Sequence, residues 1–318
     1  MTVHHQAPKP AVSGAGPSTR RVGSARPAGP LRRRPSSGYL YLLPALVVVV
    51  GIVYFAIAYT LRVSTLDWDG ISPDQRGVGL ENYTRILQDH IFWSAIWHMT
   101  LFAIAILIQM ALGLIFAVLL HSRVRFKTAY KVLLFVPVVL APAVMAPVFR
   151  QILDADGQVN QILHAVGAGG LAHPWLADPD TALYALIAIN VWQWTGFSFI
   201  LYFAGLTQID ASLIEAARMD GANNWRIVRS MLIPLTKGTS ATLIILGIIG
   251  VTKTFDVPYL VTGGGPARST EFLATYLYQQ GITNFHAGYG AALTVVLMAV
   301  ALLLAGWQIR RFRTGNEA

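Results

Sequence analysis

Residues 210–235 read DASLIEAARMDGANNWRIVRSMLIPL, a polar and charged segment that lies between two long apolar runs. Its first part contains Ser212-x-x-Glu215, the spacing of a helix capping box, so we expect a short helix to begin at Ser212. Gly221 suits the left-handed residue that ends many helices. The first half of the segment is therefore predicted to be a helix that stops at Gly221.

The second half of the 210–235 segment predicts another helix. Asn223 or Asn224 can cap its start, and Pro234 must lie close to its end. The first helix offers small or apolar side chains beside two carboxylates; these residues are Leu213, Ala216, Ala217 and Met219, with Glu215 and Asp220. Such a surface can dock into a groove on another protein. The alternative is an amphipathic helix that lies at the membrane interface without a partner.

The apolar runs around this segment indicate a membrane protein. Of the 318 residues, 54% are hydrophobic and only 12% are charged, which is more apolar than a soluble chain. A run of about 20 apolar residues can cross a bilayer core of ~30 Å, where only helices satisfy their own backbone. Six such runs can be read: Tyr39–Leu61, Ile91–Leu120, Val132–Phe149, Thr181–Ala204, Thr239–Thr262 and Ala287–Ile309. We therefore predict an all-α membrane protein with six transmembrane helices.

The loop charges predict the orientation of these helices. Lys and Arg gather in the N-terminal tail, after the second and fourth apolar runs, and at the C-terminus, whereas the first and third loops are rich in Asp. Cytoplasmic loops carry the excess of Lys and Arg. Both termini are therefore expected in the cytoplasm, in a multi-pass protein of the cell membrane.

Composition also predicts the domain organisation. Residues 1–38 are rich in Pro, Gly, Ser and Arg and are predicted to be a disordered basic cytoplasmic tail, in which His4 and His5 are solvated. Residues 39–310 form the six-span domain, and residues 311–318 form a cytoplasmic C-terminal tail. The chain has no cysteine, which excludes disulfides and thiolate metal sites. We expect no metal site, and the scattered basic clusters argue against nucleic-acid binding.

The third apolar run carries Pro137, Pro142 and Pro147 at five-residue spacing. Each proline removes a helix hydrogen bond, so the spacing predicts a bent or locally opened helix that shapes a cavity. The alternative is that proline is simply commoner in membrane helices than in soluble ones.

Two charged residues lie at membrane depth and are candidates for a solute pathway. Lys253 and Asp256 are three residues apart, which places them on the same face of a helix. They either line the outer part of a polar pathway, where they bond sugar hydroxyls, or form a local ion pair that closes the bundle or reaches outer water.

Amides and aromatic residues give the second part of this candidate pathway. In the fourth run, Asn190, Gln193, Trp194 and Phe197 recur at steps of three and four and lie on one helical stripe. Amides can bond neighbouring hydroxyls, and an aromatic face can cover a sugar ring. Gln109 in the second run is a further candidate. The alternative is that the amides bond adjacent helices while the tryptophan packs.

The residue order in the 210–235 segment resembles a known motif. Glu215-Ala-Ala is followed after three residues by Gly221, and after nine more by Met231-x-Ile233-Pro234. This order resembles the coupling motif of permease subunits of binding-protein-dependent ABC importers, in which Ile and Leu are commoner where Met231 and Ile233 stand. The carbohydrate-importing branch has stretches similar to Ala204–Gln208, Gly157–Leu163, Trp175–Pro179 and Phe255–Pro266. The resemblance covers roughly residues 39–310.

The resemblance implies an ABC type I importer permease fold and a transport function. It is nearest to first permease subunits of the maltose and glycerol-phosphate type, and implies import of a sugar or related polyol. The implied partners are an extracytoplasmic solute-binding protein, a second homologous permease subunit, identical or different, and a dimer of ABC ATPase subunits. Membrane lipid surrounds the complex. The implied coupling residues are Glu215, Ala216, Ala217, Asp220 and Gly221.

The resemblance also implies that the chain is not an enzyme and binds no cofactor of its own. ATP and Mg would bind to the partner ATPase subunits, because Lys253-Thr254 follows Thr252 and not the glycine of a phosphate-binding loop. Three alternatives stay open. One is an ABC permease for a non-sugar solute, another is an ion-coupled secondary carrier, and the third is a membrane-embedded enzyme, for which no catalytic residues can be named.

Overall fold

The structure, a computed structural model, describes residues 41–121 and 124–313, with side chains described for all of these except 309 and 311–313. The predicted tail at 1–38, with His4 and His5, lies outside these residues, as do the last five residues of the predicted C-terminal tail. Contacts divide the chain into residues 1–52 and residues 53–318, hereafter the first and second units. Because so little of the first unit is described, the fold below is mainly that of the second unit.

The elements are helices joined by short connections, apart from one two-stranded ribbon. The described part of the first unit contains α2 (Leu43–Val48) and the start of the π-helical turns η1 (Val49–Tyr54). The second unit continues with α3 (Phe55–Val63), β1 (Leu66–Asp67), β2 (Arg76–Gly77), α4 (Glu81–Gln88), α5 (His90–His121), α6 (Lys127–Val139), α7 (Pro142–Ile152) and α8 (Gln158–Ala165). Strands β1 and β2 pair antiparallel, with Leu66 opposite Gly77 and Asp67 opposite Arg76.

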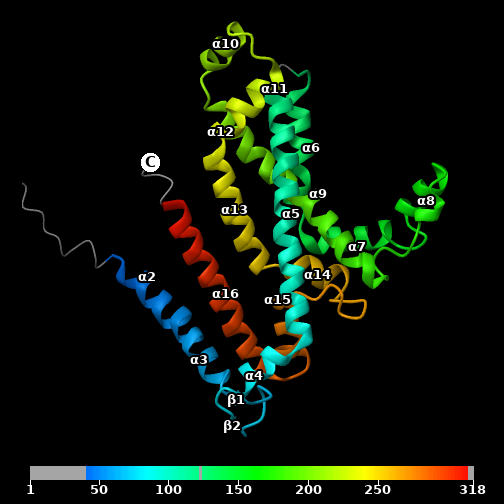
Figure 1. The fold of residues 1–318 in the computed structure, drawn as a ribbon. Helices are drawn as coiled ribbons and strands as arrows, with labels where there is room; N and C mark the ends of the chain where they lie inside the picture. The colour runs from blue at the N-terminus through cyan, green and yellow to red at the C-terminus, as the bar shows by residue number, and fades with distance from the viewer. Residues whose placement is uncertain (1–40, 122–123, 314–318) are drawn as a thin grey trace, which may run out of the picture. The chain divides into compact units, whose positions relative to one another are not determined.

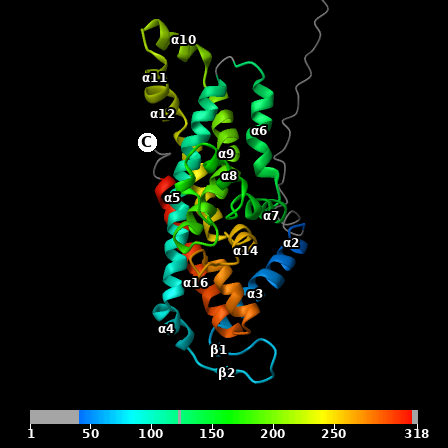
Figure 2. The ribbon, with the colours of Figure 1, turned by 90° about the vertical axis from the view of Figure 1, so that its right-hand side faces the viewer.

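The rest of the second unit is also helical. It contains η2 (Gly169–Leu171), α9 (Pro179–Thr207), α10 (Ala211–Met219), α11 (Asn224–Ile227), η3 (Val228–Leu232), α12 (Ile233–Leu235), α13 (Lys237–Thr252), α14 (Asp256–Val261), α15 (Leu273–Tyr278), η4 (Gln279–Thr283) and α16 (Ala287–Arg313). Figures 1 and 2 place α10 and α11 at one end of this unit, hereafter the α10 end. Helix α4 and the strands lie at the opposite end, hereafter the α4 end.

Four helical segments among the described residues are long and apolar enough to cross a membrane singly. They are Leu43–Val63, His90–His121, Pro179–Thr207 and Ala287–Gln308. Two further pairs of helices pass the same test together, which gives up to six spans if each bent pair counts as one. The prediction of an all-α membrane protein is confirmed, whereas the cytoplasmic location of both termini stays a prediction.

The third predicted span is broken at Pro142, whereas Pro137 and Pro147 lie inside the helices on either side. Helices α6 and α7 meet at an angle of 98°, because Leu140 and Ala141 are extended and Pro142 begins α7. Figures 1 and 2 show α7 leaving the direction of α6. The predicted bend or local opening is confirmed.

The fifth predicted span is also discontinuous. Helix α13 ends at Thr252, and α14 starts only at Asp256, after Phe255, whose backbone is neither helical nor extended. The prediction that Lys253 and Asp256 share one helix face is therefore wrong, because no continuous helix joins them. At the other end of α13 the chain bends by 60° at Thr236, two residues after Pro234.

Helices α5 and α9 pack closely and join two apolar cores. A Cβ atom added at Gly113 of α5 would lie 2.6 Å from the Cβ of Ser198 on α9, so only glycine allows this approach. One core includes Phe102, Phe272, Leu273, Ala292 and Leu293. The other, hereafter the α10-end core, includes Leu120, Phe199, Leu206, Ile227 and Leu232. The two long helices thus connect the α4 end mechanically to the α10 end.

Candidate functional site

One cavity of about 600 Å³ lies among α5, α9, α13 and the two helix breaks. All six residues predicted for the solute pathway line it, namely Gln109, Asn190, Gln193, Trp194, Lys253 and Asp256. Phe197 of the predicted stripe on α9 lines it too. The sequence therefore identified residues from three separate segments that the fold brings together, while their role in transport stays a prediction.

The amide side chains in the cavity differ in how they are satisfied. Gln193 is 3% exposed, and its Nε2 donates to the carbonyl oxygen of Leu140 at the α6–α7 break, at 3.3 Å. Gln109 is 7% exposed, and its Oε1 has no hydrogen-bond partner among the described residues. Leaving a buried acceptor unsatisfied costs about 1–3 kcal/mol. A hydroxyl or a water in the cavity would remove this cost.

The charged groups in the cavity come from the break between α13 and α14. Lys253 and Asp256 are both exposed, and the structure gives neither side chain a hydrogen bond or ion pair within the described ranges. The alternative of a local ion pair is thus not realised. The break leaves an ammonium donor and a carboxylate acceptor available to a solute.

Aromatic rings complete the lining. Trp194 is 40% exposed and meets Phe197 edge-on, with ring centroids 6.0 Å apart. Trp192 does not line the cavity but packs edge-on against Phe149 at 5.1 Å. An exposed indole beside free amides is an arrangement that suits a ring with one apolar face and peripheral hydroxyls.

The 210–235 segment forms the predicted helix, turn and helix, with one correction at its start. The N-cap of α10 is Asp210, whose Oδ1 accepts from the backbone N–H of Ser212 at 2.9 Å. The predicted capping box at Ser212 and Glu215 is wrong, because the extended Asp210 lies one residue before the helix and satisfies that donor first. The same hydrogen bond holds the pKa of the Asp210 carboxyl below its ordinary value.

The end of α10 follows the prediction. Gly221 has φ +78°, and its N–H donates to Arg218, while the N–H of Ala222 donates to Ala217 at 2.9 Å. These two bonds form a Schellman motif, which requires a left-handed residue at Gly221. The prediction of a glycine cap is therefore confirmed.

The second helix begins as predicted and reaches Leu235. Asn223 caps α11, since its Oδ1 accepts from the N–H of Arg226 at 2.8 Å. From α11 the helical chain continues through η3 and α12 to Leu235, one residue past Pro234.

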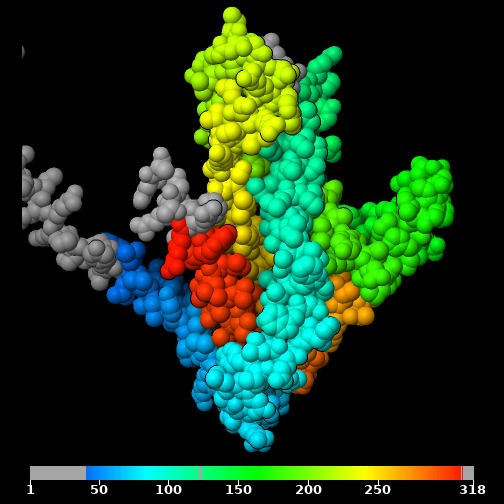
Figure 3. All heavy atoms as spheres, viewed as in Figure 1, coloured from blue at the N-terminus to red at the C-terminus, as the bar shows by residue number. Residues whose placement is uncertain are grey.

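The surface of this segment is largely unpartnered. Ile214 and Ala217 pack against the α10-end core, whereas Glu215, Ala216, Asp220 and Gly221 are exposed. Large apolar side chains are exposed as well: Leu213 at 49%, Met219 at 89% and Trp225 at 68%. Figure 3 shows the segment covering the α10 end as a free surface. Exposed apolar side chains with carboxylates beside them fit a docking surface.

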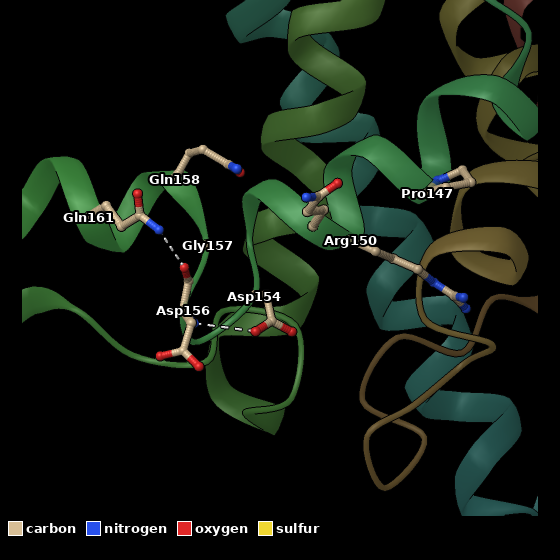
Figure 4. Close-up of a pocket in the computed structure, with 8 residues that line it drawn as sticks. Pro147, Arg150, Asp154, Asp156, Gly157, Gln158 and Gln161 are labelled. Atoms are coloured by element: carbon tan, nitrogen blue, oxygen red, sulfur yellow. Dashed lines mark hydrogen bonds between the residues drawn. The ribbon is translucent and has the colours of Figure 1, made fainter.

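A second pocket, of about 520 Å³, was not foreseen from the sequence. Its lining residues come from α7, α8 and the turn between them: Pro147, Arg150, Gln151, Asp154, Asp156, Gly157, Gln158 and Gln161 (Figure 4). Arg150 turns away from the carboxylates, and its Nε donates to the carbonyl of Val261 at 2.8 Å, which ties α7 to α14. The spacing Asp154-x-Asp156 was the only signal available in the sequence.

Apolar helices of membrane length around a polar cavity, with an exposed helical surface at one end, define an integral membrane transport subunit. Residues 109–314 match the family described as binding-protein-dependent transport system inner membrane component. The chain belongs to this family, whose members are transport subunits of ABC importers and not enzymes. Within the described ranges, no group of three or more His, Asp or Glu residues could hold a metal ion.

Individual relatives and structures agree with this assignment. The chain is 34% identical to the probable ABC transporter permease protein YurN of Bacillus subtilis, over 88% of this chain and 97% of the relative. It is 31% identical to the lactose transport system permease protein LacF of Rhizobium radiobacter, over 88% and 94%. The structure resembles that of a bacterial ABC transporter that imports the acidic polysaccharide alginate, with TM-score 0.75 and 20% identity over 87% and 94% of the two chains. The fold is that of an ABC importer permease.

Proposed function

We propose that this chain is the membrane-spanning subunit of an ATP-driven importer that moves a sugar or related polyol. The proposal rests on the cavity. It combines three amide side chains whose hydrogen-bonding capacity is free or only partly used, two charged side chains without an ion-pair partner among the described residues, and an exposed indole. Relatives named as transporting lactose, sulfoquinovosyl glycerol and trehalose or maltose support the substrate class.

The cavity residues would bind a polyol through complementary hydrogen bonds. Each amide offers both a donor and an acceptor, Lys253 offers donors, and Asp256 offers acceptors, so adjacent hydroxyls can be bonded in pairs. Trp194 would cover the apolar face of the sugar ring. Affinity spread over several moderate contacts suits a transport pathway, because a tightly held solute would not be released.

The partners expected for this subunit are an extracytoplasmic solute-binding protein, a second permease subunit and two ATPase subunits. One similar structure is of an alginate transporter in complex with a periplasmic protein bound to an alginate pentasaccharide, which supports a partner of the first kind. The exposed α10 surface would bind to an ATPase subunit. ATP and Mg would bind there, and this chain would carry the resulting movement through α5 and α9 to the cavity.

Uptake by the assembled complex tests this proposal. Proteoliposomes that contain the complex, ATP inside and the binding protein outside should accumulate the sugar that the binding protein selects. Gln109→Leu should lower this uptake about five- to tenfold, the loss of one buried hydrogen bond of ~1 kcal/mol or more, whereas Trp192→Leu, outside the cavity, should not. Uptake by this chain alone in an ion gradient would instead establish a secondary carrier.

A further inference from the structure

The start of α6 carries a cluster of positive charge that neither the cavity nor the α10 surface uses. The ammonium groups of Lys127 and Lys131 lie 4.9 Å and 3.8 Å from the ring centroid of Phe203 on α9. Arg125 is exposed just before them. Two like charges therefore lie close to one aromatic ring, and their mutual repulsion makes the arrangement costly unless an anion is present.

The described protein supplies no such anion. The first turn of α6 has no acidic residue, and the ion pair found within the described ranges joins Arg268 and Glu271, which belong to the connection before α15. Neither lysine has a carboxylate within ion-pair distance in those ranges. The lysines are thus held close together without a counter-charge from the part of the chain that the structure describes.

The surface below the two lysines is apolar and exposed. On α6, Val132 is 58% exposed and Val139 70%, and at 3.6 residues per turn both lie within about 100° of Lys131 around the helix. Tyr130, at 47% exposed, directly precedes Lys131, and tyrosine favours the headgroup level of membranes. With 13 residues, α6 is about 20 Å long, close to the ~15 Å depth of one leaflet plus its interface.

We propose that Lys127 and Lys131 bind the phosphate headgroup of an anionic phospholipid, whose acyl chains lie along the exposed apolar face of α6. The leaflet is the one at the α10 end, where α6 begins (Figure 1). The continuous apolar face favours a lipid over a protein partner as the occupant, because acyl chains need such a surface next to the charge. This site is independent of the solute and of the ATPase surface.

Native mass spectrometry of the purified full chain tests the proposal, with phosphatidylglycerol and phosphatidylcholine titrated in parallel. Two cations near a headgroup contribute about 1 kcal/mol each, so the chain should prefer phosphatidylglycerol roughly tenfold to thirtyfold. The double variant Lys127→Gln, Lys131→Gln should lose this preference, and Lys127→Arg, Lys131→Arg should keep it. The matched control Arg226→Gln, Arg229→Gln removes the same charge from exposed positions in α11 and η3 and should also keep it.

A measurement on the unmodified chain tests the same proposal even if the lysine variants do not fold. In vesicles of phosphatidylglycerol, an amine reagent should label Lys127 and Lys131 several-fold more slowly than in phosphatidylcholine, while Lys237 should label equally in both. Equal binding of the two lipids, an equal loss in the control variant, or displacement of the lipid by inorganic phosphate would overturn the proposal. Protection of both lysines by the ATPase subunits alone would assign the cluster to that partner and overturn it too.

Discussion

The two ends of the second unit are held together in different ways. At the α4 end, the Asp89 carboxylate accepts hydrogen bonds from the hydroxyls of Tyr276 and Tyr289, which joins the start of α5 to α15 and α16. The Arg85 guanidinium lies 4.4 Å from the centroid of the Tyr289 ring. At the α10 end, the side-chain and backbone caps of α10 and α11 come from the 210–235 segment itself.

The difference lies in which contacts hold each end in shape. Polar groups at the α4 end satisfy one another across helices distant in sequence, so this end is a rigid unit. The α10 end keeps its shape through local caps and exposes Leu213, Met219 and Trp225. Such a helix keeps its shape locally and leaves its outer face open to another protein. If an ATPase subunit binds this face, its movement can be passed on to the rest of the chain.

The largest effect is expected from a change in the cap of α10. Gly221→Val should lower ATP-driven uptake and ATPase association roughly thirtyfold, because a β-branched residue at this left-handed position costs about 2 kcal/mol. The cost is conformational, since a Cβ added at Gly221 would meet nothing within 4 Å. Quantitative pull-down with the ATPase measures it.

Two variants control this experiment. Gly221→Asn should recover most of the association, because asparagine tolerates left-handed backbone. Gly306→Ala, at an equally open position inside α16, should have no effect. If Gly221→Val assembled and transported normally, the α10 surface would not be the coupling site.

A smaller effect, on stability and not on coupling, is expected at the α4 end. Asp89→Asn should lower the unfolding free energy by about 1–2 kcal/mol, since it weakens two hydrogen bonds to a partly buried carboxylate. ATPase association should stay unchanged. Thermal unfolding in detergent measures the first quantity, and Asp67→Asn, an exposed carboxylate in β1, is the matched control. Equal destabilisation by both variants would remove the special role of Asp89.

The same carboxylate gives the α4 end a defined acid response. Burial tends to raise the pKa of Asp89, but the tyrosine hydroxyls and backbone N–H groups outweigh it and hold the pKa below its ordinary value. Burial and the neighbouring Asp89 raise the pKa of Tyr276 to about 12, so this donor stays protonated. The stabilisation is therefore present above the ordinary aspartate pKa of ~3.9 and lost as the pH falls through the lower, folded value.

This response predicts how the Asp89→Asn variant depends on pH. The stability difference between the unmodified chain and the variant should be constant above about pH 5 and shrink below about pH 4. Chemical unfolding at several pH values measures it. A difference that grew on acidification would mean that Asp89 is protonated in the folded chain.

The smallest effect is expected from the start of α10. Asp210→Ala should destabilise the helix by about 1 kcal/mol, the usual value of an N-cap, and weaken ATPase association roughly fivefold or less. Ser212→Ala should have almost no effect, because the Ser212 side chain is not the cap. Hydrogen exchange of the α10 amides compares the two. The reverse ranking would restore the capping box expected from the sequence.

The sequence predicted the fold where its signals are local. Gly221, Asn223 and the three prolines act through their own backbone, so their effects could be foreseen. The apolar runs of α5, α9 and α16 are likewise long enough to be predicted as membrane-spanning helices. The N-cap of α10 was predicted wrongly, because Asp210 and Ser212 are both residue types that cap helices well. Which of the two caps α10 depends on the path of the chain after α9.

The features that were predicted wrongly or missed depend mainly on contacts between distant parts of the chain. The end of α13 near Lys253 was missed, although Pro258 removes a helix hydrogen bond to the carbonyl of Thr254 and could have signalled it. The cross-helix bonds of Asp89 join residues 187 and 200 positions apart, which one sequence cannot reveal. The residues predicted for the pathway could be picked out because amides and charges are rare at membrane depth, whereas their convergence on one cavity required the structure.

Cross-linking can test whether α10 contacts an ATP-hydrolysing subunit, because this chain has no cysteine. Met219→Cys then introduces a single thiol at an 89% exposed position of α10, and Val166→Cys does so at a 70% exposed position after α8. In the assembled complex, a thiol-to-amine cross-linker should join position 219, but not position 166, to an ATP-hydrolysing subunit. An intact complex in which position 219 never cross-links to that subunit would contradict the account.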